Sequence, residues 1–386
     1  MSDQHQPATQ AIVAGRTPGS SSLAPALWAS TVWESDSLVD ARRRATGTRA
    51  QEFYSRYANP TVRQFEEAVA TLEGAEDAIA FASGMGAVAS VVLSMCSAGD
   101  HVVAQRQLYA GTLAFLQGPC ARFGIETTLV DGHVPGAFAE AVRPGRTMMV
   151  LAETPSNPRL DLVDLDELGA LRGPVTVVDS TLATPLGQRP LDHGVHLVLH
   201  SATKGIAGHN DATLGVVAGE KDYIDAIWAY SVLHGATPSP FDALNGLRGI
   251  RTLSVRTTHQ AGSALFVAHA LLDHPGVAAV HHPGLPGHPQ HDLAKRQMRH
   301  GGTMIAVELA GGLEAADRFL ARVQLLHRAT SLGGPETLVC HPATTTHASL
   351  TPDEAAHVGV TAGMLRISVG LEDPTDVLRD IVRALG

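Results

Sequence analysis

The chain has 386 residues, of which 44% are hydrophobic and 17% are charged, as expected for a globular protein with two or three domains. Its net charge of −10 argues against a nucleic acid or an anionic membrane surface as partner. The three cysteines are far apart, and there is neither a signal-peptide pattern nor an apolar run long enough to span a membrane, so we expect a cytoplasmic protein without disulfides.

The first 60 residues predict little regular structure. Residues 1–24 are rich in Ser, Pro, Gln and Gly, and residues 25–60 show no clear periodicity. We interpret this stretch as an arm that lies on another surface. A helix is predicted over 61–73, because apolar residues recur there at helical spacing: Val62, Phe65, Ala68, Val69 and Leu72.

A strand–turn–helix unit follows. The strand is predicted at 78–82 and the helix from 87 to about 95, with the turn Ser83-Gly84-Met85-Gly86 between them. Such a turn directs backbone N–H groups and the positive end of a helix dipole toward an anion. The alternative is a plain tight turn without a ligand.

Strands and helices then alternate up to residue 200, which indicates a parallel sheet with helices on both faces. Glu153, Asp179 and Lys204 each follow a predicted strand, so they should lie at the carboxyl edge of the sheet, where ligands bind in open sheets. The expected strands are 101–104, 125–130, 147–152, 175–178 and 195–199, and the expected helices are 111–123 and 162–172.

The pattern changes near residue 250 to a mixture of helices and short strands, which favours a smaller α+β domain. We therefore divide the chain into an N-terminal arm (1–60), a large domain (61–250) and a C-terminal domain (251–386). In the last part we expect helices at 252–273, 314–322, 352–357 and 375–385, and strands at 304–309, 337–339 and 365–369.

Lys204 is the residue around which the chemistry is arranged. It follows an apolar strand in His200-Ser-Ala-Thr-Lys-Gly205. Partial burial disfavours a charged amine and makes it a nucleophile toward carbonyls. Ser201 and Thr203 share one side of an extended chain and could hold a phosphate. A reactive lysine beside a phosphate suggests pyridoxal phosphate (PLP); a surface lysine in a Gly-rich loop is the alternative.

Seven stretches, in the same order, resemble the Cys/Met-metabolism family of PLP enzymes. This family includes cystathionine γ-synthase and γ-lyase, methionine γ-lyase and O-acetylhomoserine sulfhydrylase. The resemblance implies the PLP-dependent transferase fold of type I, with a mostly parallel central sheet, helices on both faces and a smaller C-terminal α+β domain. The stretches begin at Tyr54 (YSRYANPT), Ser83 (SGMGA), Glu153 (ETPSNP), Val178 (VDST), Ser201 (SATK), Ser331 (SLGG) and Leu365 (LRISVGLE).

The resemblance implies a role for each of several residues. Lys204 would bind the cofactor's aldehyde and then act as the base. Asp179 would keep the ring nitrogen protonated, and Tyr109 would stack on the ring and help to protonate the leaving group. The phosphate would be held by Ser83, Gly84, Met85, Ser201 and Thr203, and from a neighbouring subunit by Tyr54 and Arg56.

The resemblance also implies a substrate site. Arg366 would bind the substrate carboxylate as a fork, with Asn157 and the backbone of Ser331 beside it. Each residue alone has an ordinary explanation: a core tyrosine for Tyr109, a helix cap for Asp179, an ion pair for Arg366.

Departures from the family pattern bear on the substrate. Family enzymes that act on cystathionine carry an arginine where this chain has Ala114 and a glutamate where it has Thr330. A distal charged end would be poorly paired without them, which favours a small, uncharged γ-substituent. Gly111 replaces the cysteine typical of methionine γ-lyase-like members, Gly205 a common aromatic residue, and Thr345 a usual methionine.

We therefore expect α,γ-elimination from a methionine-like or non-standard, for example γ-halogenated, amino acid. The alternatives are γ-replacement on an O-acylhomoserine and cystathionine γ-synthase or γ-lyase activity. The intact Lys204, Asp179 and Arg366 argue against a catalytically silent subunit. A class I aldolase would also need a buried lysine, but it has no use for a phosphate turn or for Asp179. The resemblance implies a homotetramer built from dimers. The His-rich run 281–291 is expected to be a loop without metal.

Overall fold

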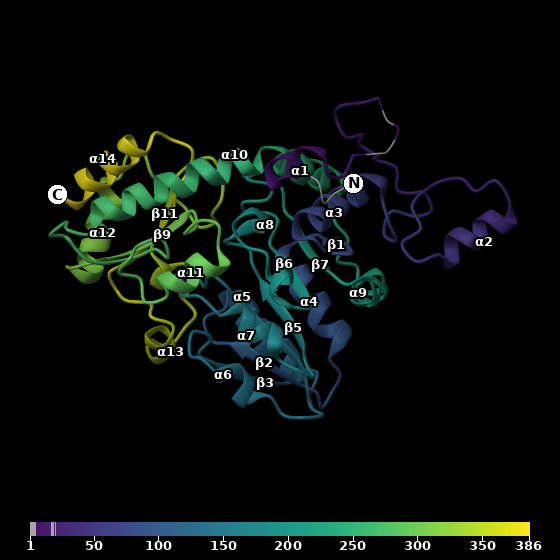
Figure 1. Ribbon diagram of the computed structural model, residues 1–386, viewed down its shortest axis with the longest axis horizontal. Coiled ribbons are helices and arrows are strands. Elements are labelled where there is room, and N and C mark those ends of the chain that lie inside the picture. The colour runs from purple at the N-terminus through teal and green to yellow at the C-terminus, as the bar shows by residue number, and fades with distance from the viewer. Residues whose placement is uncertain (1–4, 17–18, 20) are drawn as a thin grey trace.

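The computed structural model describes residues 5–16, 19 and 21–386, which contain two sheets flanked by helices (Figure 1). The larger sheet has the order β1-β7-β6-β5-β4-β2-β3, and within it only β7 runs antiparallel to its neighbours. Its carboxyl edge therefore collects the chain segments that follow the six strands running in the same direction, β1 to β6. The strands are β1 (Asp77–Phe81), β2 (His101–Gln105), β3 (Glu126–Val130), β4 (Thr147–Glu153), β5 (Val175–Asp179), β6 (Leu197–His200) and β7 (Gly215–Gly219).

Helices cover both faces of this sheet, as the β/α alternation predicted. One face packs on α4 (Gly84–Met95), α5 (Ala110–Phe115) and α9 (Lys221–His234). The other face packs on α3 (Pro60–Glu73), α6 (Ala137–Ala141), α7 (Leu165–Ala170) and α8 (Thr184–Gly187). The expected mostly parallel sheet between two helical layers is therefore present.

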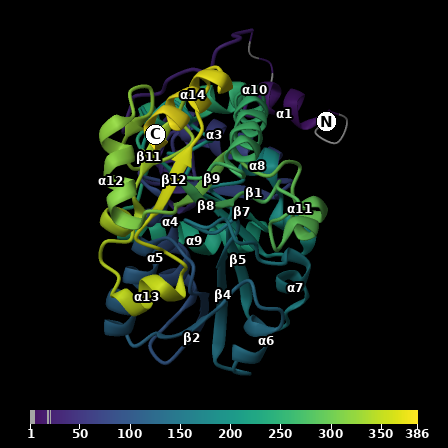
Figure 2. The same ribbon diagram turned by 90° about the vertical axis from the view of Figure 1, so that its left-hand side faces the viewer.

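The smaller sheet has the order β10-β11-β12-β9-β8 and is antiparallel except for the β10–β11 pair. Figure 2 shows it above the larger sheet, with α14 and α12 on its outer side. The strands are β8 (Val277–His281), β9 (Met304–Leu309), β10 (His327–Arg328), β11 (Leu338–Cys340) and β12 (Met364–Ser368); the helices are α11 (His291–Gln297), α12 (Gly312–Arg322), α13 (Pro352–His357) and α14 (Pro374–Leu385).

Helix α3 forms where its sequence signals predict it. The side chain of Asn59 accepts a hydrogen bond from the backbone N–H of Thr61 at 2.9 Å and caps the helix, and Pro60 occupies the first turn. Gly74 ends the helix with φ +69, a left-handed conformation that suits glycine. Phe65 is fully buried, which stabilises the fold by about 2–3 kcal/mol.

Helix α10 (Pro240–Leu271) joins the two sheets as one continuous rod along the top of the molecule in Figure 1. It packs on α1 and α3 at one end and on α14 at the other. The predicted domain boundary at residue 250 falls inside this helix, so a division at that residue stays a prediction.

The N-terminal arm contains more structure than its composition predicted. Residues 7–13 form α1 (Pro7–Val13), which packs on α10, and residues 38–46 form α2 (Leu38–Thr46). The cause of α2 is local, since Ser37 caps it by accepting a hydrogen bond from the N–H of Asp40. Figure 1 shows α2 at the far end of an extended segment that projects away from the two sheets.

Several other expectations need correction. The predicted helix 162–172 is shorter, because Asp164 caps it and α7 spans only Leu165–Ala170. The predicted helix 111–123 contains a π turn (Leu116–Cys120), where Pro119 cannot donate a backbone hydrogen bond. Strand β7 and helix α9 were not predicted. No helix in the described part of the chain combines the length and the apolar character needed to cross a bilayer.

Candidate active site

A cavity of about 560 Å³ opens at the carboxyl edge of the larger sheet and is closed on its other side by the smaller domain. Of the residues predicted to form the site, all but Tyr54 and Arg56 line it. The predicted residues that line the cavity are Ser83, Gly84, Met85, Tyr109, Asn157, Asp179, Ser201, Thr203, Lys204, Ser331 and Arg366.

The predicted anion turn lies at the start of α4. Gly84–Gly86 form the first turn of this helix rather than a separate loop, and Ser83 caps it by accepting from the N–H of Gly86 at 3.0 Å. A Cβ on Gly84 would lie 2.8 Å from the Cβ of Ser201, so only glycine lets these two segments approach so closely. The hydroxyl of Thr203 is already bonded to the backbone of Leu214, at 3.1 Å as donor and 2.9 Å as acceptor.

Asp179 ends β5 on the floor of the cavity. Its carboxylate accepts hydrogen bonds from the backbone N–H of Thr181, at 3.0 Å, and from the Thr181 hydroxyl. Burial raises the pKa of Asp179, while the two bonds from Thr181 oppose that rise. A carboxylate that lines the cavity is suited to pair with a protonated ring nitrogen.

Glu153 is a buried acid to which the sequence assigned no role beyond its strand end. It pairs with Asp179 across neighbouring parallel strands, and its Oε2 accepts from the backbone N–H of Tyr109 at 2.7 Å. Burial and the nearby Asp179 raise the pKa of Glu153 well above its usual value. The acid therefore fixes the segment that carries Tyr109.

Lys204 reaches across the cavity to the smaller domain. Its Nζ donates to the hydroxyl of Ser331 at 2.8 Å. Burial lowers the pKa of Lys204, and the positive charge of Arg366 lowers it further. Both causes favour the neutral, nucleophilic amine, as predicted from the buried strand before it.

The loop that carries Ser331 approaches the Lys204 segment closely, which two unusual backbone positions permit. Ser331 itself has φ +87, a left-handed conformation that costs a non-glycine residue about 1–3 kcal/mol. Gly333 has φ +79, and a Cβ on it would lie 2.5 Å from the backbone nitrogen of Gly205. A larger residue at Gly333 would hold this loop away from the lysine segment.

Arg366 lies on β12 in the smaller domain and is buried. It donates to Oδ1 of Asn157 at 3.0 Å and to the backbone oxygen of Ser331 at 2.9 Å. Arg366 thus contacts both of the other predicted substrate-binding residues.

A second arginine stabilises the loop that follows Lys204. Arg256, on α10, donates to the carbonyl oxygens of Gly205 at 2.8 Å and Ile206 at 3.2 Å. Burial lowers its pKa to about 10. This residue was not predicted, because an arginine inside a long helix has no distinctive sequence motif.

A model of the Cys/Met metabolism PLP-dependent enzymes matches residues 8–386. The chain belongs to this family. It is 41% identical to an L-methionine gamma-lyase of Porphyromonas gingivalis over 94% of this chain and 92% of that protein. It is 39% identical to an O-succinylhomoserine sulfhydrylase of Pseudomonas aeruginosa, over 93% and 90% of the two chains.

Solved structures confirm the predicted type I fold. A cystathionine gamma synthase from Xanthomonas oryzae pv. oryzae, in complex with aminoacrylate and cysteine, superposes with a TM-score of 0.93 at 35% identity, over 99% of this chain and 98% of that one. The chain is therefore a PLP-dependent enzyme of the Cys/Met metabolism family.

The cavity fits the cofactor of this family. It offers a partly buried amine at Lys204, a buried carboxyl at Asp179 on the strand beside it, and a capped helix start within contact of Ser201. These are the three features that an aldehyde, a ring nitrogen and a phosphate require. In the described part of the chain, no three or more His, Cys, Asp or Glu side chains are grouped to hold a metal ion, the run 281–291 included.

The remaining wall of the cavity is uncharged. Among the described lining residues the acids are Glu153 and Asp179, both at strand ends, and the cations are Lys204 and Arg366. The wall beyond them is formed by hydroxyl-bearing and apolar side chains, including Thr330, Thr345, Thr346, Ala110 and Leu332. Thr330, at the position of the absent glutamate, lines the cavity; Gly111 and Ala114 are not among the lining residues.

Proposed function

We propose that this enzyme eliminates a small, uncharged γ-substituent from an L-amino acid, which is methionine-like or non-standard, such as a γ-halogenated one. The observation that supports this most directly is the cavity wall, which offers no charged partner beyond Lys204, Arg366, Glu153 and Asp179. A second amino-acid end, as in cystathionine, would bury two charges there without partners. The methionine gamma-lyase relative agrees with this proposal.

Each residue contributes a distinct step. Bound PLP supplies an electron sink for the carbon atoms next to the amino group. Lys204 removes the proton at Cα and moves the one at Cβ, a role favoured by burial and by the charge of Arg366, which both lower the pKa of its amine. Asp179 keeps a proton on the ring nitrogen, and Tyr109 stacks on the ring and protonates the departing group.

Binding residues complete the site. Arg366 holds the substrate carboxylate as a fork, with Asn157 and Ser331 on either side. The cofactor phosphate would be held at the start of α4 by Ser83, Gly84 and Met85, with Ser201 and Thr203 opposite. The bond between Thr203 and Leu214 has to open for Thr203 to donate to the phosphate.

Two further contacts come from another subunit. Tyr54 and Arg56 do not line the cavity of their own chain. We assign them to the phosphate of a neighbouring copy, in a homotetramer built from dimers. We also place the enzyme in the cytoplasm, because its three cysteines are free and buried, as is usual in a reducing compartment.

A second candidate is γ-replacement on an O-acylhomoserine, which uses the same residues up to loss of the γ-group. The sulfhydrylase relative favours it. Cystathionine γ-synthase or γ-lyase activity is the third, favoured by the fold relative but not by Thr330.

One experiment separates these reactions. The purified enzyme with PLP is incubated with methionine, O-acetylhomoserine, cystathionine and a γ-chloro amino acid, with and without sulfide, and products are identified by mass. A 2-oxo acid from methionine or the chloro substrate supports elimination. Rapid turnover of cystathionine would contradict the argument from the uncharged wall, and normal turnover by Lys204→Ala would contradict the assigned base.

A further inference from the structure

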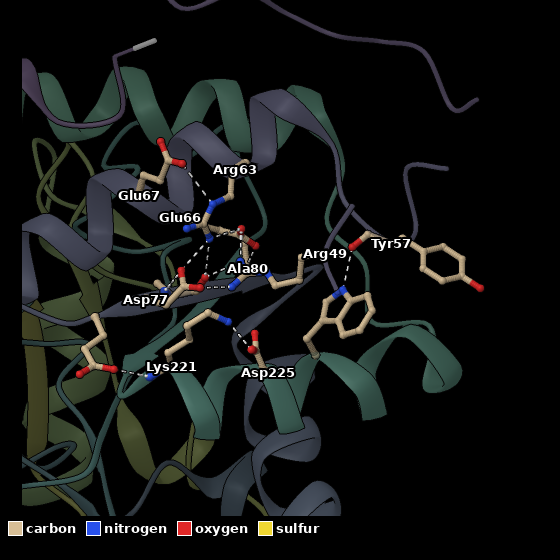
Figure 3. Close-up of polar contacts among 12 residues, drawn as sticks. Arg49, Tyr57, Arg63, Glu66, Glu67, Asp77, Ala80, Lys221 and Asp225 are labelled. Carbon is tan, nitrogen blue, oxygen red and sulfur yellow. Dashed lines mark hydrogen bonds and ion pairs between the residues drawn. The ribbon is translucent and has the colours of Figure 1, made fainter. Parts of the chain in front are cut away.

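The end of the N-terminal arm is tied to the large domain by a buried group of ions (Figure 3). Arg49 donates to the Asp77 carboxylate at 2.6 Å, to the backbone oxygen of Ala78 at 2.6 Å, and to the Glu66 carboxylate. Arg63 binds the same two acids, at 2.7 Å to Asp77 and 3.3 Å to Glu66. One arginine from the arm thus shares two acids of the large domain with Arg63, which also pairs with Glu67 at 3.2 Å.

This contact is not an ordinary surface ion pair. The side chains of Arg49, Glu66 and Asp77 are only 8–9% exposed, so water screens them little. The other Glu66 oxygen accepts from the backbone N–H of Ala80 at 2.8 Å, which fixes the acid on β1. Arg49 holds φ +54, a left-handed conformation that a non-glycine residue adopts only when other contacts compensate.

A second contact lies a few residues further along the arm. The indole N–H of Trp228, on α9, donates to the backbone oxygen of Tyr57 at 2.7 Å. The guanidinium of Arg56 donates to the backbone oxygen of Val232 at 2.7 Å and lies 5.4 Å from the centre of the Tyr54 ring. The segment that carries Tyr54 and Arg56 is therefore held between the Arg49 ion group and α9.

The position of this segment excludes a role in its own site. The residues that line the cavity begin at Ser83, and Arg56 lies instead in a separate hollow with Tyr57 and Trp228. Tyr54, in the same segment, is 43% exposed. The exposed Tyr54 ring can therefore contact another molecule, and Arg56 can do so once its bond to Val232 opens.

We propose that Arg49 is a positioning residue that acts between subunits: it fixes the segment of residues 49–57 so that Tyr54 and Arg56 complete the cofactor-phosphate site of a second copy of the chain. The inference rests on the proposed function, which assigns those two residues to the neighbour's phosphate. A segment fixed in advance loses little conformational entropy when the cofactor binds. A loose segment has to be ordered at that moment, which weakens cofactor binding.

The test measures the dissociation constant of PLP for the full-length, cofactor-free protein by titration of cofactor absorbance. Arg49→Met keeps the aliphatic stem and removes the fork, and should raise the constant by about tenfold or more. Trp228→Phe keeps the ring, removes the bond to Tyr57 and should act in the same direction. Arg43→Met is the matched control, because Arg43 is 72% exposed on the same arm and pairs only with Asp40; it should bind PLP as the wild type does.

Mixed oligomers then separate action between subunits from a local effect. Lys204→Ala keeps an intact arm but cannot bind the aldehyde covalently. Co-expressed with Arg49→Met in equal amounts, it should form mixed dimers in which the Arg49→Met chain's own Lys204 is completed by the partner's arm. Random pairing makes roughly half of the dimers mixed with one complete site each, so roughly a quarter of the sites should regain tight PLP binding.

A partner that carries Arg49→Met and Lys204→Ala together should give no recovery. Unchanged PLP binding in both Arg49→Met and Trp228→Phe would overturn the inference. So would weak binding that an intact partner arm does not repair, because Arg49 would then act only within its own chain. Failure of the wild type itself to bind PLP would instead contradict the proposed function.

Discussion

The amine of Lys204 lies 2.8 Å from the hydroxyl oxygen of Ser331, so a residue at the edge of the larger sheet contacts a loop of the smaller domain. The same loop offers its backbone oxygen to Arg366. Residues of both domains therefore build one site, and a substrate carboxylate bound at Arg366, as proposed, would place its Cα beside the amine. The predictions below test this arrangement.

Arg366→Met should affect both substrate binding and the titration of Lys204. Without the fork, KM for the amino acid should rise roughly 100-fold. The positive charge of Arg366 lowers the pKa of Lys204, so its loss raises that pKa and the amine stays protonated up to a higher pH. The rate at which cofactor-free enzyme recombines with PLP falls as the amine becomes protonated, and this fall should begin at a higher pH in the variant. An unchanged pH profile would show that Arg366 does not act on the amine.

Glu153→Gln should stabilise the cofactor-free protein more as the pH rises. Burial and Asp179 raise the pKa of Glu153 above 4.5, so the folded protein binds its proton where the unfolded chain has released it. The stability that Glu153 contributes is complete below the unfolded pKa and is lost as the pH rises through the folded pKa; glutamine is free of this loss.

Melting temperatures of the Glu153→Gln and wild-type proteins, compared from pH 4 to 8, measure this difference, which should grow upward from about pH 4.5. Glu126→Gln is the control of opposite sign, since hydrogen bonds from Arg143 and Arg146 lower the pKa of this exposed acid. A difference for Glu153→Gln that shrinks with pH would contradict the assigned direction.

Thr330→Glu should shift the substrate preference. Thr330 lines the cavity beyond the reacting atoms, and a carboxylate there can pair with a distal ammonium group. The ratio of kcat/KM for cystathionine over methionine should rise by about tenfold or more. Thr330→Gln, of equal size but neutral, should leave the ratio near the wild-type value; an equal rise in both variants would point to shape rather than charge.

Gly333→Ala should separate the Ser331 loop from Lys204. The new Cβ would lie 2.5 Å from the backbone nitrogen of Gly205, in a residue whose φ is +79. We expect a loss of about 2 kcal/mol or more in the free energy of unfolding, together with a fall in kcat. Gly262→Ala, in α10 where a Cβ meets open space, should not destabilise the protein and serves as the comparison.

The sequence predicted the core of the site because its motifs lie at strand ends. Asp179 and Lys204 follow apolar runs that could only be buried strands, and parallel strands bring their carboxyl ends to one edge. The PLP cofactor and the type I fold followed from the resemblance carried by these motifs, and both are confirmed by the family model and the fold relatives.

Other features were not readable from the sequence, because their local signal is weak or because they depend on contacts between distant segments. Helix α2 has a weak apolar pattern and is started by one capping serine. Glu153 acquires its raised pKa from burial and from Asp179, which is 26 residues further along the chain. Arg49 has a role only because α3 and β1 present Glu66 and Asp77 to it.

The unbroken helix α10 has a mechanical consequence for the reaction. It starts against α3, ends against α14, and through Arg256 grips the carbonyls that directly follow the reactive lysine. Because α10 is one continuous helix, a tilt at its α14 end also displaces the groups bonded along its length, including the loop after Lys204. A shift of the smaller domain toward an arriving amino acid should therefore also move the amine that has to receive it.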